Sequence, residues 1–280
     1  MNPRPSPLNH NSMRIIDCKL SHLMLVTVLL AFFIGCSSIT VGIPREKPGP
    51  PDAAARAEVQ AVLSALSSHN AGLINFKGKG KIKVWQKGRL KFKETVYWIA
   101  SETSKISIVF LVGGYPAVKM ASDGKWFYYY EIGKGEPIFK KIAASDASLK
   151  RIVSISIQTD DVLSLLAGRV PIREHHSAIL EPQENKPGYV LILKKRWWGV
   201  SEKIYLDQTK MHAQQVEMYN RSGSLIYRAQ FDEMQTIKEY RVPARLSITN
   251  GTDANFELDI NAFWADVAVT PSMFELKPPE

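Results

Sequence analysis

Few side chains in this sequence have the types and spacing of catalytic groups or metal ligands. His175-His176 is a candidate pair, but adjacent side chains on a strand point to opposite faces and do not converge on one metal ion. The 280-residue sequence contains no HExxH motif, no cysteine–histidine cluster and no GxSxG motif. Gly113-Gly114 lacks the strand-to-helix setting of a phosphate-binding loop. We therefore expect no enzyme activity, no metal site and no cofactor.

Cys36 has a setting that points to a different chemistry, the covalent attachment of lipid. The uncharged apolar run 23–34 follows a basic segment and ends at small residues, as in secretory signal peptides. The run is too short for a comfortable membrane span, which needs about 20 apolar residues. The segment Phe33–Cys36 resembles the lipobox of bacterial lipoproteins, with Phe33 where leucine is usual. We predict that residues 1–35 are a signal peptide, cleaved before Cys36.

The other cysteine and the residue after Cys36 agree with this interpretation. Cys18 lies in the predicted signal peptide, so the mature chain has no second thiol for a disulfide or a metal site. Ser37 stands where proteobacterial lipoproteins that stay at the inner membrane tend to have aspartate. We expect a lipid anchor at the periplasmic face of the outer membrane. The alternative is an uncleaved anchor helix with an unmodified cysteine.

Residues 36–52 are predicted to be a tether, and residues 53–280 to be one domain. Prolines are frequent in 42–51, and proline fixes φ and removes a hydrogen-bond donor, so this stretch stays extended. The formal charge of the chain is +9, and its lysines alternate along strand-like segments. This charge serves either solubility or attraction to anionic lipid headgroups. No nucleic-acid motif accompanies it, so we expect no nucleic-acid partner.

The hydrophobic pattern predicts two helices in a mainly β domain. Residues 53–68 place apolar side chains at helical spacing. A second helix is expected at Thr159–Leu166, with Thr159 as its N-cap, Asp160-Asp161 in its first turn and Gly168 at its end. Period-2 patterns predict antiparallel strands at 76–84, 90–98, 106–112, 118–120, 125–132, 189–196, 202–206, 213–219, 224–233, 244–249 and 255–264.

One face of this predicted sheet is apolar throughout, and only two short helices are available to cover it. Such a sheet either packs into a filled core or leaves a hollow that accepts an apolar ligand. Both alternatives remain open from composition alone. The side chains that we expect to face inward and to line a cavity are Ile82, Val84, Phe92, Trp98, Ile106, Ile108, Met120, Trp126 and Tyr128.

The segment Val109–Val118 joins two predicted strands through an unusually apolar loop. Connecting loops are mostly polar, so an apolar tip on a membrane-tethered protein is a candidate for contact with lipid or with a partner. The alternative is a loop that is tucked under the sheet.

The order of these features resembles the LolA/LolB-like superfamily, which contains the periplasmic lipoprotein carrier and the outer-membrane lipoprotein receptor. The resemblance spans nearly the whole predicted domain and consists of patterns of small and apolar residues. Its pieces are the opening helix through Leu66, the Gly78-x-Gly80 strand, the strand and turn 106–116, the hairpin 121–125, the helix and stop 162–171, the segment 242–246 and the ending 270–276.

The resemblance implies an unclosed antiparallel β-barrel of about eleven strands, with short helices as a lid over an apolar cavity. It implies binding of lipid or lipoprotein acyl chains and a role in their localisation, with a periplasmic lipoprotein carrier as a candidate partner. The membrane-contact loop would comprise Leu111, Val112, Tyr115 and Pro116, although Gly113-Gly114-Tyr115 replaces the leucine of the receptor. The alternative function is an envelope assembly lipoprotein that binds a protein partner without carrying lipid.

Overall fold

The computed structural model describes residues 53–101, 104–133, 136–144 and 154–278, all of which belong to one unit, Pro51–Glu280. The predicted signal peptide, Cys36 and the tether lie outside the described residues. None of the helices in the described ranges is both long enough and apolar enough to cross a membrane.

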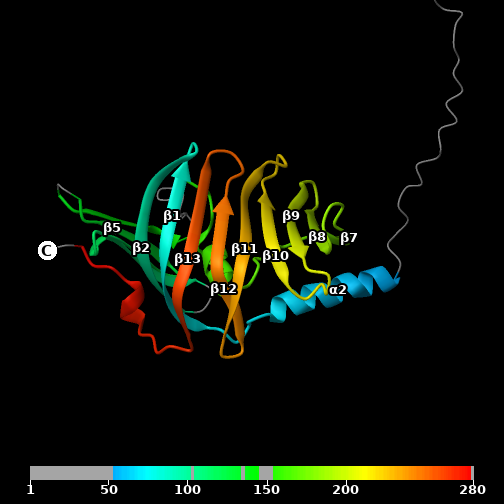
Figure 1. Cartoon of the computed structure of the whole chain (residues 1–280), viewed down its shortest axis with the longest axis horizontal. Coiled ribbons are helices and arrows are strands. Elements are labelled where there is room, and N and C mark those ends of the chain that lie inside the picture. The colour runs from blue at the N-terminus through cyan, green and yellow to red at the C-terminus, as the bar shows by residue number, and fades with distance from the viewer. Residues whose placement is uncertain (1–52, 102–103, 134–135, 145–153, 279–280) are drawn as a thin grey trace, which may run out of the picture. The chain divides into compact units, whose positions relative to one another are not determined.

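The described residues form one antiparallel sheet of thirteen strands, whose spatial order is β6-β5-β4-β3-β2-β1-β13-β12-β11-β10-β9-β8-β7. The sheet twists and curls but does not close, because β6 and β7 are its two free edges (Figure 1). The strands are β1 (Asn75–Gln86), β2 (Arg89–Ser101), β3 (Lys105–Val112), β4 (Tyr115–Asp123), β5 (Trp126–Glu131), β6 (Ile138–Ala143), β7 (Ser177–Pro182), β8 (Tyr189–Lys195), β9 (Gly199–Leu206), β10 (Ala213–Tyr219), β11 (Leu225–Ile237), β12 (Tyr240–Thr249) and β13 (Ala254–Ala265).

The predicted fold class, an unclosed β-barrel with short helices, is confirmed. The sheet of the described residues has thirteen strands rather than about eleven, because the sequence patterns miss the edge strands β6 and β7. Both strands have most of their side chains exposed or half-buried on both faces. An edge strand of this kind lacks the regular apolar alternation by which a half-buried strand is recognised.

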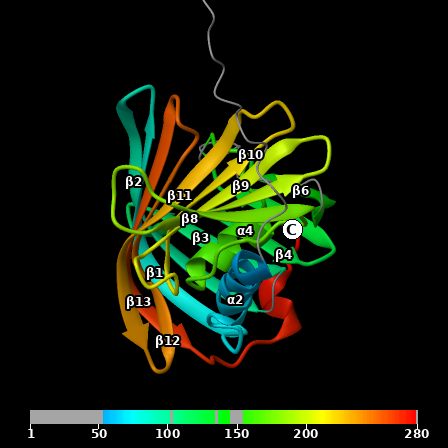
Figure 2. The ribbon, with the colours of Figure 1, turned by 90° about the vertical axis from the view of Figure 1, so that its right-hand side faces the viewer.

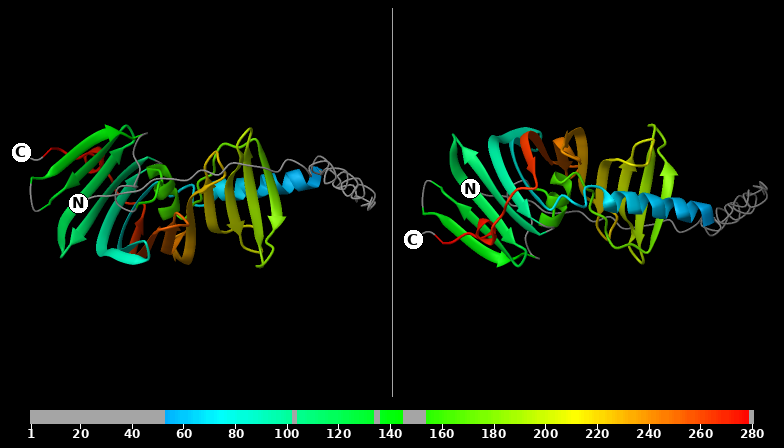
Figure 3. Two further views of the ribbon diagram at one scale, coloured as in Figure 1. Left: turned by 90° about the horizontal axis from the view of Figure 1, so that it is seen from above. Right: turned by 90° about the horizontal axis from the view of Figure 1, so that it is seen from below.

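Two helices and a short C-terminal turn complete the described part of the domain. Helix α4 (Thr159–Leu166) lies inside the curve of the sheet and contacts β12 (Figure 2). Helix α2 (Ala53–Ser68) contacts the edge strand β7 through a face that buries Val62, Leu63 and Leu66. The 3-10 turn η2 (Pro271–Phe274) packs on the outer face of β3 and β4, at the end of the sheet opposite α2 (Figure 3).

The residues at the two ends of α4 explain where the helix begins and ends. The helix begins at Thr159, as predicted, but Gln158 is its N-cap, so the prediction of Thr159 as the cap is wrong. The C-terminal prediction is confirmed, since Gly168 adopts a φ of +74° and its N–H donates to Leu165 O at 3.0 Å. A Cβ at Gly168 would lie 2.3 Å from Arg241 O, so only glycine allows α4 to end this close to β12.

Candidate functional site

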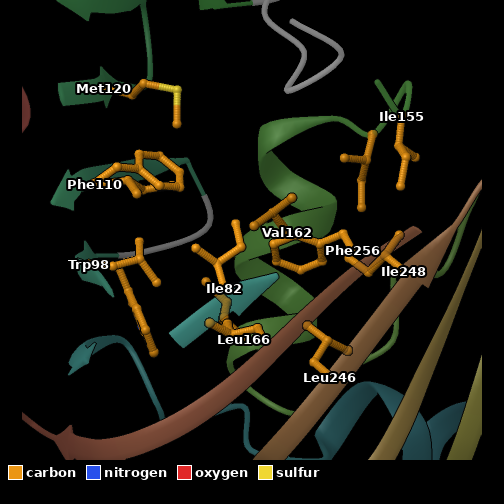
Figure 4. Close-up of a pocket in the computed structure, with 14 residues that line it drawn as sticks. Ile82, Trp98, Phe110, Met120, Ile155, Val162, Leu166, Leu246, Ile248 and Phe256 are labelled. Atoms are coloured by element: carbon orange, nitrogen blue, oxygen red, sulfur yellow. The ribbon is translucent and has the colours of Figure 1, made fainter. Parts of the chain in front are cut away.

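A hollow of about 50 Å³ lies between α4 and the inner face of the sheet. Its walls come from strands far apart in the sequence, and their side chains point toward one another across it (Figure 4). Every described residue that lines the hollow is apolar. The lining residues are Ile82, Val96, Trp98, Ile108, Phe110, Met120, Ile155, Ile157, Val162, Leu166, Leu246, Ile248, Phe256 and Leu258.

Strand register explains how these side chains come together. Trp98, Ile108 and Met120 are direct cross-strand neighbours on β2, β3 and β4, so they form a row on one face. A second row crosses β12 and β13 through Leu246 and Leu258. Because α4 lies above both rows, Val162 and Leu166 close the hollow from the side opposite the sheet.

Gly78 makes room for the indole of Trp98. The two residues are paired across β1 and β2, and a Cβ at Gly78 would lie 2.0 Å from Trp98 Cζ2. The ring therefore lies flat over the glycine, where any other residue would displace it. Trp98 Nε1 is buried and has no hydrogen-bond partner among the described residues.

The nine residues that the sequence assigned to a cavity fall into three groups. Val84 and Ile106 are buried in the core on the same inner face, and Phe92 is partly buried against that core, but these three lie outside the lining of the hollow. Those that line it are Ile82, Trp98, Ile108 and Met120.

Trp126 and Tyr128 lie on the outer face of the sheet, contrary to the expectation that they face inward. In β4 and β5, Met120 pairs with Tyr129, whereas Tyr128 pairs with Ala121. Because successive side chains of a strand alternate between faces, Tyr128 and Trp126 are on the face opposite Met120. Lys141 Nζ lies 4.7 Å from the centre of the Trp126 ring, as expected for an aromatic group at a solvated surface.

Sequence reasoning missed the lid and the far wall of the hollow. Val162 and Leu166 were recognised only as part of a helix, and Ile155 falls in a stretch without a clear pattern. Leu246 and Leu258 have the same period-2 alternation as the strands that were used. Their position in one row with Ile82 depends on the pairing of β1 with β13, the first strand with the last, which has no signal in a single sequence.

A buried polar cluster holds α4 on its other side. Asp161 Oδ2 accepts a hydrogen bond from the Tyr227 hydroxyl of β11 at 3.0 Å and pairs with the Arg173 guanidinium. The backbone N–H of Arg173 in turn donates to Glu202 Oε2 of β9 at 2.9 Å. Asp161 and Glu202 are almost fully buried. The cluster therefore links the first turn of α4 to two strands of the β7–β11 half of the sheet.

The electrostatics of this cluster favour the protonated form of Glu202. Burial raises the pKa of Glu202 to about 8, and the hydrogen bond and charge of Arg173 only partly oppose it. Burial also raises the pKa of Asp161, although the Arg173 guanidinium and the Tyr227 hydroxyl lower it. Glu202 Oε1 has no partner among the described residues, which is consistent with a neutral acid at neutral pH.

The chemistry available at the hollow is the burial of an apolar group. None of the cluster residues Asp161, Arg173, Glu202 and Tyr227 lines the hollow. Within the described ranges, no three histidine, cysteine, aspartate or glutamate side chains are grouped as a metal site. The geometry at the hollow therefore suits a hydrocarbon ligand.

The apolar segment between β3 and β4 forms the tip of a hairpin. Gly113 and Gly114 have φ of +61° and +89°, as in a two-residue type I′ turn. Tyr115 is 79% exposed, and Val112 and Pro116 are also exposed. The tip is therefore not tucked under the sheet, which was the alternative left open by the sequence.

Comparisons with known proteins show which folds are similar. No family model matches the chain, and a search of curated proteins finds no match. Among solved structures, a LolA superfamily protein from Nitrosomonas europaea has a TM-score of 0.54 and 13% identity, over 78% of this chain and 97% of that chain. The chain has a LolA-like fold.

Two further structures share the LolA-like fold. A domain of an outer membrane lipoprotein-sorting protein from Vibrio parahaemolyticus has a TM-score of 0.55 and 12% identity, over 76% of this chain and 94% of that chain. A DUF1329 family protein from Desulfovibrio piger has a TM-score of 0.54 and 10% identity, over 79% and 97%. The predicted resemblance to the LolA/LolB-like superfamily is confirmed in its fold, and at these identities the likeness extends to the fold alone.

Proposed function

We propose that this chain is a membrane-anchored lipoprotein that binds the acyl chains of a lipid or a lipoprotein and takes part in their localisation to the outer membrane. The observation that carries the proposal is the wholly apolar hollow between α4 and a sheet of LolA-like fold. Each methylene group buried there contributes about 0.8 kcal/mol, so an acyl chain needs no cofactor and no charged partner to bind.

The size of the hollow implies that the described conformation is closed. Its volume of about 50 Å³ is well below the roughly 150 Å³ of a cavity that admits benzene. An acyl chain therefore enters only when the hollow widens. Val162 and Leu166 contribute a large part of one wall, so an outward displacement of α4 is the movement that would widen it. Trp98 Nε1 would then donate a hydrogen bond to an ester or carboxyl oxygen of the ligand.

Membrane contact and anchoring are further parts of the proposal. The exposed hairpin tip would insert Leu111, Val112, Tyr115 and Pro116 into the lipid surface while acyl chains are transferred. A lipid on Cys36 would hold the domain at the periplasmic face of the outer membrane. A periplasmic lipoprotein carrier would then be the partner that delivers the cargo.

Two isoleucines of β3 provide a matched test of acyl-chain binding. Ile108 lines the hollow, whereas Ile106, two residues away on the same face, is buried outside it. Ile108→Phe fills the hollow, so we expect the affinity for a fluorescent fatty acyl probe to fall about tenfold, or about 1.4 kcal/mol. Ile106→Phe overpacks the core by the same volume and should leave the affinity unchanged.

Two outcomes would refute the proposal. If wild-type protein does not bind the probe, or if both substitutions change the affinity equally, the hollow is not an acyl-chain site. Thermal unfolding of both variants controls for loss of the fold, since overpacking alone costs about 1–3 kcal/mol.

The alternative function, an assembly lipoprotein that binds a protein partner, is favoured by two observations. The hollow is small, and large apolar side chains are exposed at hairpin tips. Absence of bound lipid together with a stable complex formed through the β3–β4 tip would support this function.

A further inference from the structure

The hairpin between β8 and β9 ends in an unusual combination of side chains. Three consecutive cations, Lys194, Lys195 and Arg196, are followed directly by Trp197 and Trp198. We call these five residues the basic-aromatic tip. The hollow and the β3–β4 tip do not include any of them.

The two tryptophans are presented to solvent. Trp197 is 84% exposed and Trp198 is 41% exposed. Lys195 Nζ lies 5.0 Å from the centre of the Trp198 ring, and Arg196 Cζ lies 5.5 Å from that of Trp197. Each aromatic ring is therefore stacked with a cation, and neither is covered by the core.

The backbone of the tip supports a functional role for Trp197. Its φ is +71°, in the left-handed region that is unfavourable for a bulky residue. A glycine or asparagine at this position would relieve the strain and remove an exposed indole at the same time. A strained backbone that displays a large apolar group indicates a role outside the folding of the chain.

The three cations of the tip have no acidic partner among the described residues. In the part of the chain that the structure describes, none of Lys194, Lys195 and Arg196 forms an ion pair. Glu202, the acid of β9, pairs with Leu193 across β8 and β9 and is buried on the inner face. The tip thus offers three free cations beside two exposed indoles.

The topology places this tip on the same side of the sheet as the β3–β4 tip. Neighbouring strands alternate in direction, so the turns after β1, β3, β8, β10 and β12 all lie at the same ends of the strands. In Figure 1 these strand ends are at the top, where β1, β10 and β12 end. Tyr115 and Trp197 are therefore exposed at the same strand ends of the sheet.

We propose that the basic-aromatic tip binds the surface of an anionic phospholipid bilayer. Trp197 and Trp198 would lie at the level of the headgroups, where amphipathic rings are favoured, and the three cations would lie against headgroup phosphates. Each cation near such a surface strengthens association roughly fivefold. This site does not depend on acyl-chain binding in the hollow.

The test uses the full chain bound to vesicles and measures quenching of its tryptophan fluorescence by phospholipids brominated near the headgroup. Vesicles of phosphatidylcholine are compared with vesicles that also contain phosphatidylglycerol. We expect quenching to be at least severalfold stronger with phosphatidylglycerol, and the double substitution Trp197→Ala/Trp198→Ala to remove most of that increase.

Trp264 is the matched control. It is also exposed, and Lys77 Nζ lies 5.2 Å from its ring centre. However, it pairs with Lys77 at the opposite ends of the strands from the basic-aromatic tip. Trp264→Ala should preserve the increase in quenching. The triple substitution Lys194→Gln/Lys195→Gln/Arg196→Gln should reduce quenching to the phosphatidylcholine level, and high salt should act in the same way.

Two results would overturn the proposal. One is equal quenching in the two kinds of vesicle. The other is an increase that survives replacement of both tip tryptophans, in which case other aromatic groups meet the lipid and the tip is left for a protein partner. Ile108→Phe serves as a separate reference, because it blocks the hollow and should not change quenching at the tip. Failure of acyl-chain binding and failure of this site are therefore distinguishable.

Discussion

Helix α4 packs against an apolar surface on one side and a polar cluster on the other, and the comparison shows which side fixes the position of the helix. On one side Val162 and Leu166 meet an apolar wall, where burial and dispersion have no preferred direction. On the other side Asp161 accepts directed hydrogen bonds from Tyr227 and Arg173. The apolar side tolerates changes of shape, whereas the polar side loses its contacts once the helix shifts. The polar cluster is therefore the part that sets the position of the lid.

The largest expected effect comes from breaking the polar side. Asp161→Leu leaves the buried Tyr227 hydroxyl and the Arg173 guanidinium without their acceptor, so we expect the free energy of unfolding to fall by about 3–5 kcal/mol. Urea denaturation measures this change. Asp160→Leu is the control, because Asp160 is exposed on the same turn and should change stability little. Equal losses in the two variants would refute a special role for the polar cluster.

A substitution on the apolar side of α4 should lower stability without lowering the affinity for an acyl chain. Leu166→Ala removes a buried lid side chain and should cost about 2–4 kcal/mol in unfolding free energy. The same change enlarges the hollow, so the affinity for an acyl probe should be retained or increased. Titration with the probe checks this, and a loss of binding in a variant that remains folded would show that the lid wall must be complete for the ligand to bind.

The polar side should also make stability depend on pH. The pKa of Glu202 is raised from 4.5 to about 8, so the folded chain binds more protons than the unfolded chain between these values. The contribution of this group is therefore most favourable below pH 4.5 and is lost as the pH rises through 8. Glu202→Gln removes this dependence, and we expect it to raise the free energy of unfolding by a few kcal/mol above pH 8 relative to wild type.

Denaturation of wild type and Glu202→Gln across this range gives the difference directly. The difference should be small in acid and should grow toward pH 8, because only the wild-type chain loses the proton. A difference that stays constant with pH would mean that Glu202 is ionised throughout and that its burial is compensated in another way.

The smallest expected effect concerns Trp98, which faces the apolar side. Trp98→Phe removes an unpartnered N–H as well as part of the ring, and the two contributions oppose each other, so stability should change by less than about 1 kcal/mol. Affinity for an acyl ester should fall more than affinity for a plain hydrocarbon of the same length. Equal changes for the two ligands would show that Nε1 does not contact the ligand oxygen.

The contrast between local and long-range information explains what the sequence could predict. Helix α2 and the central strands follow from apolar periodicity, and the hairpin at 121–125 follows from Gly124, which tolerates positive φ. The edge strands β6 and β7 lack that periodicity because none of their side chains is fully buried. In β5, a continuous aromatic run conceals which face is inward, so Trp126 and Tyr128 were assigned to the wrong side.

The residues of the site also differ in how far the sequence could predict them. The predicted wall residues Trp98, Ile108 and Met120 share a face by simple alternation. The polar cluster has no such signal, because Asp161 and Tyr227 are 66 positions apart and meet only after the sheet has curled around α4. Asp161 could be recognised from sequence only as an acid in a first helical turn, where carboxylates are common.

Native mass spectrometry of protein purified without detergent tests the central claim most directly. We predict that wild-type protein and Ile106→Phe retain a bound species with the mass of a lipid or an acylated peptide, and that Ile108→Phe loses it. Lipid-free wild-type protein that also fails to take up added phospholipid would contradict the account, and so would bound lipid that persists in Ile108→Phe.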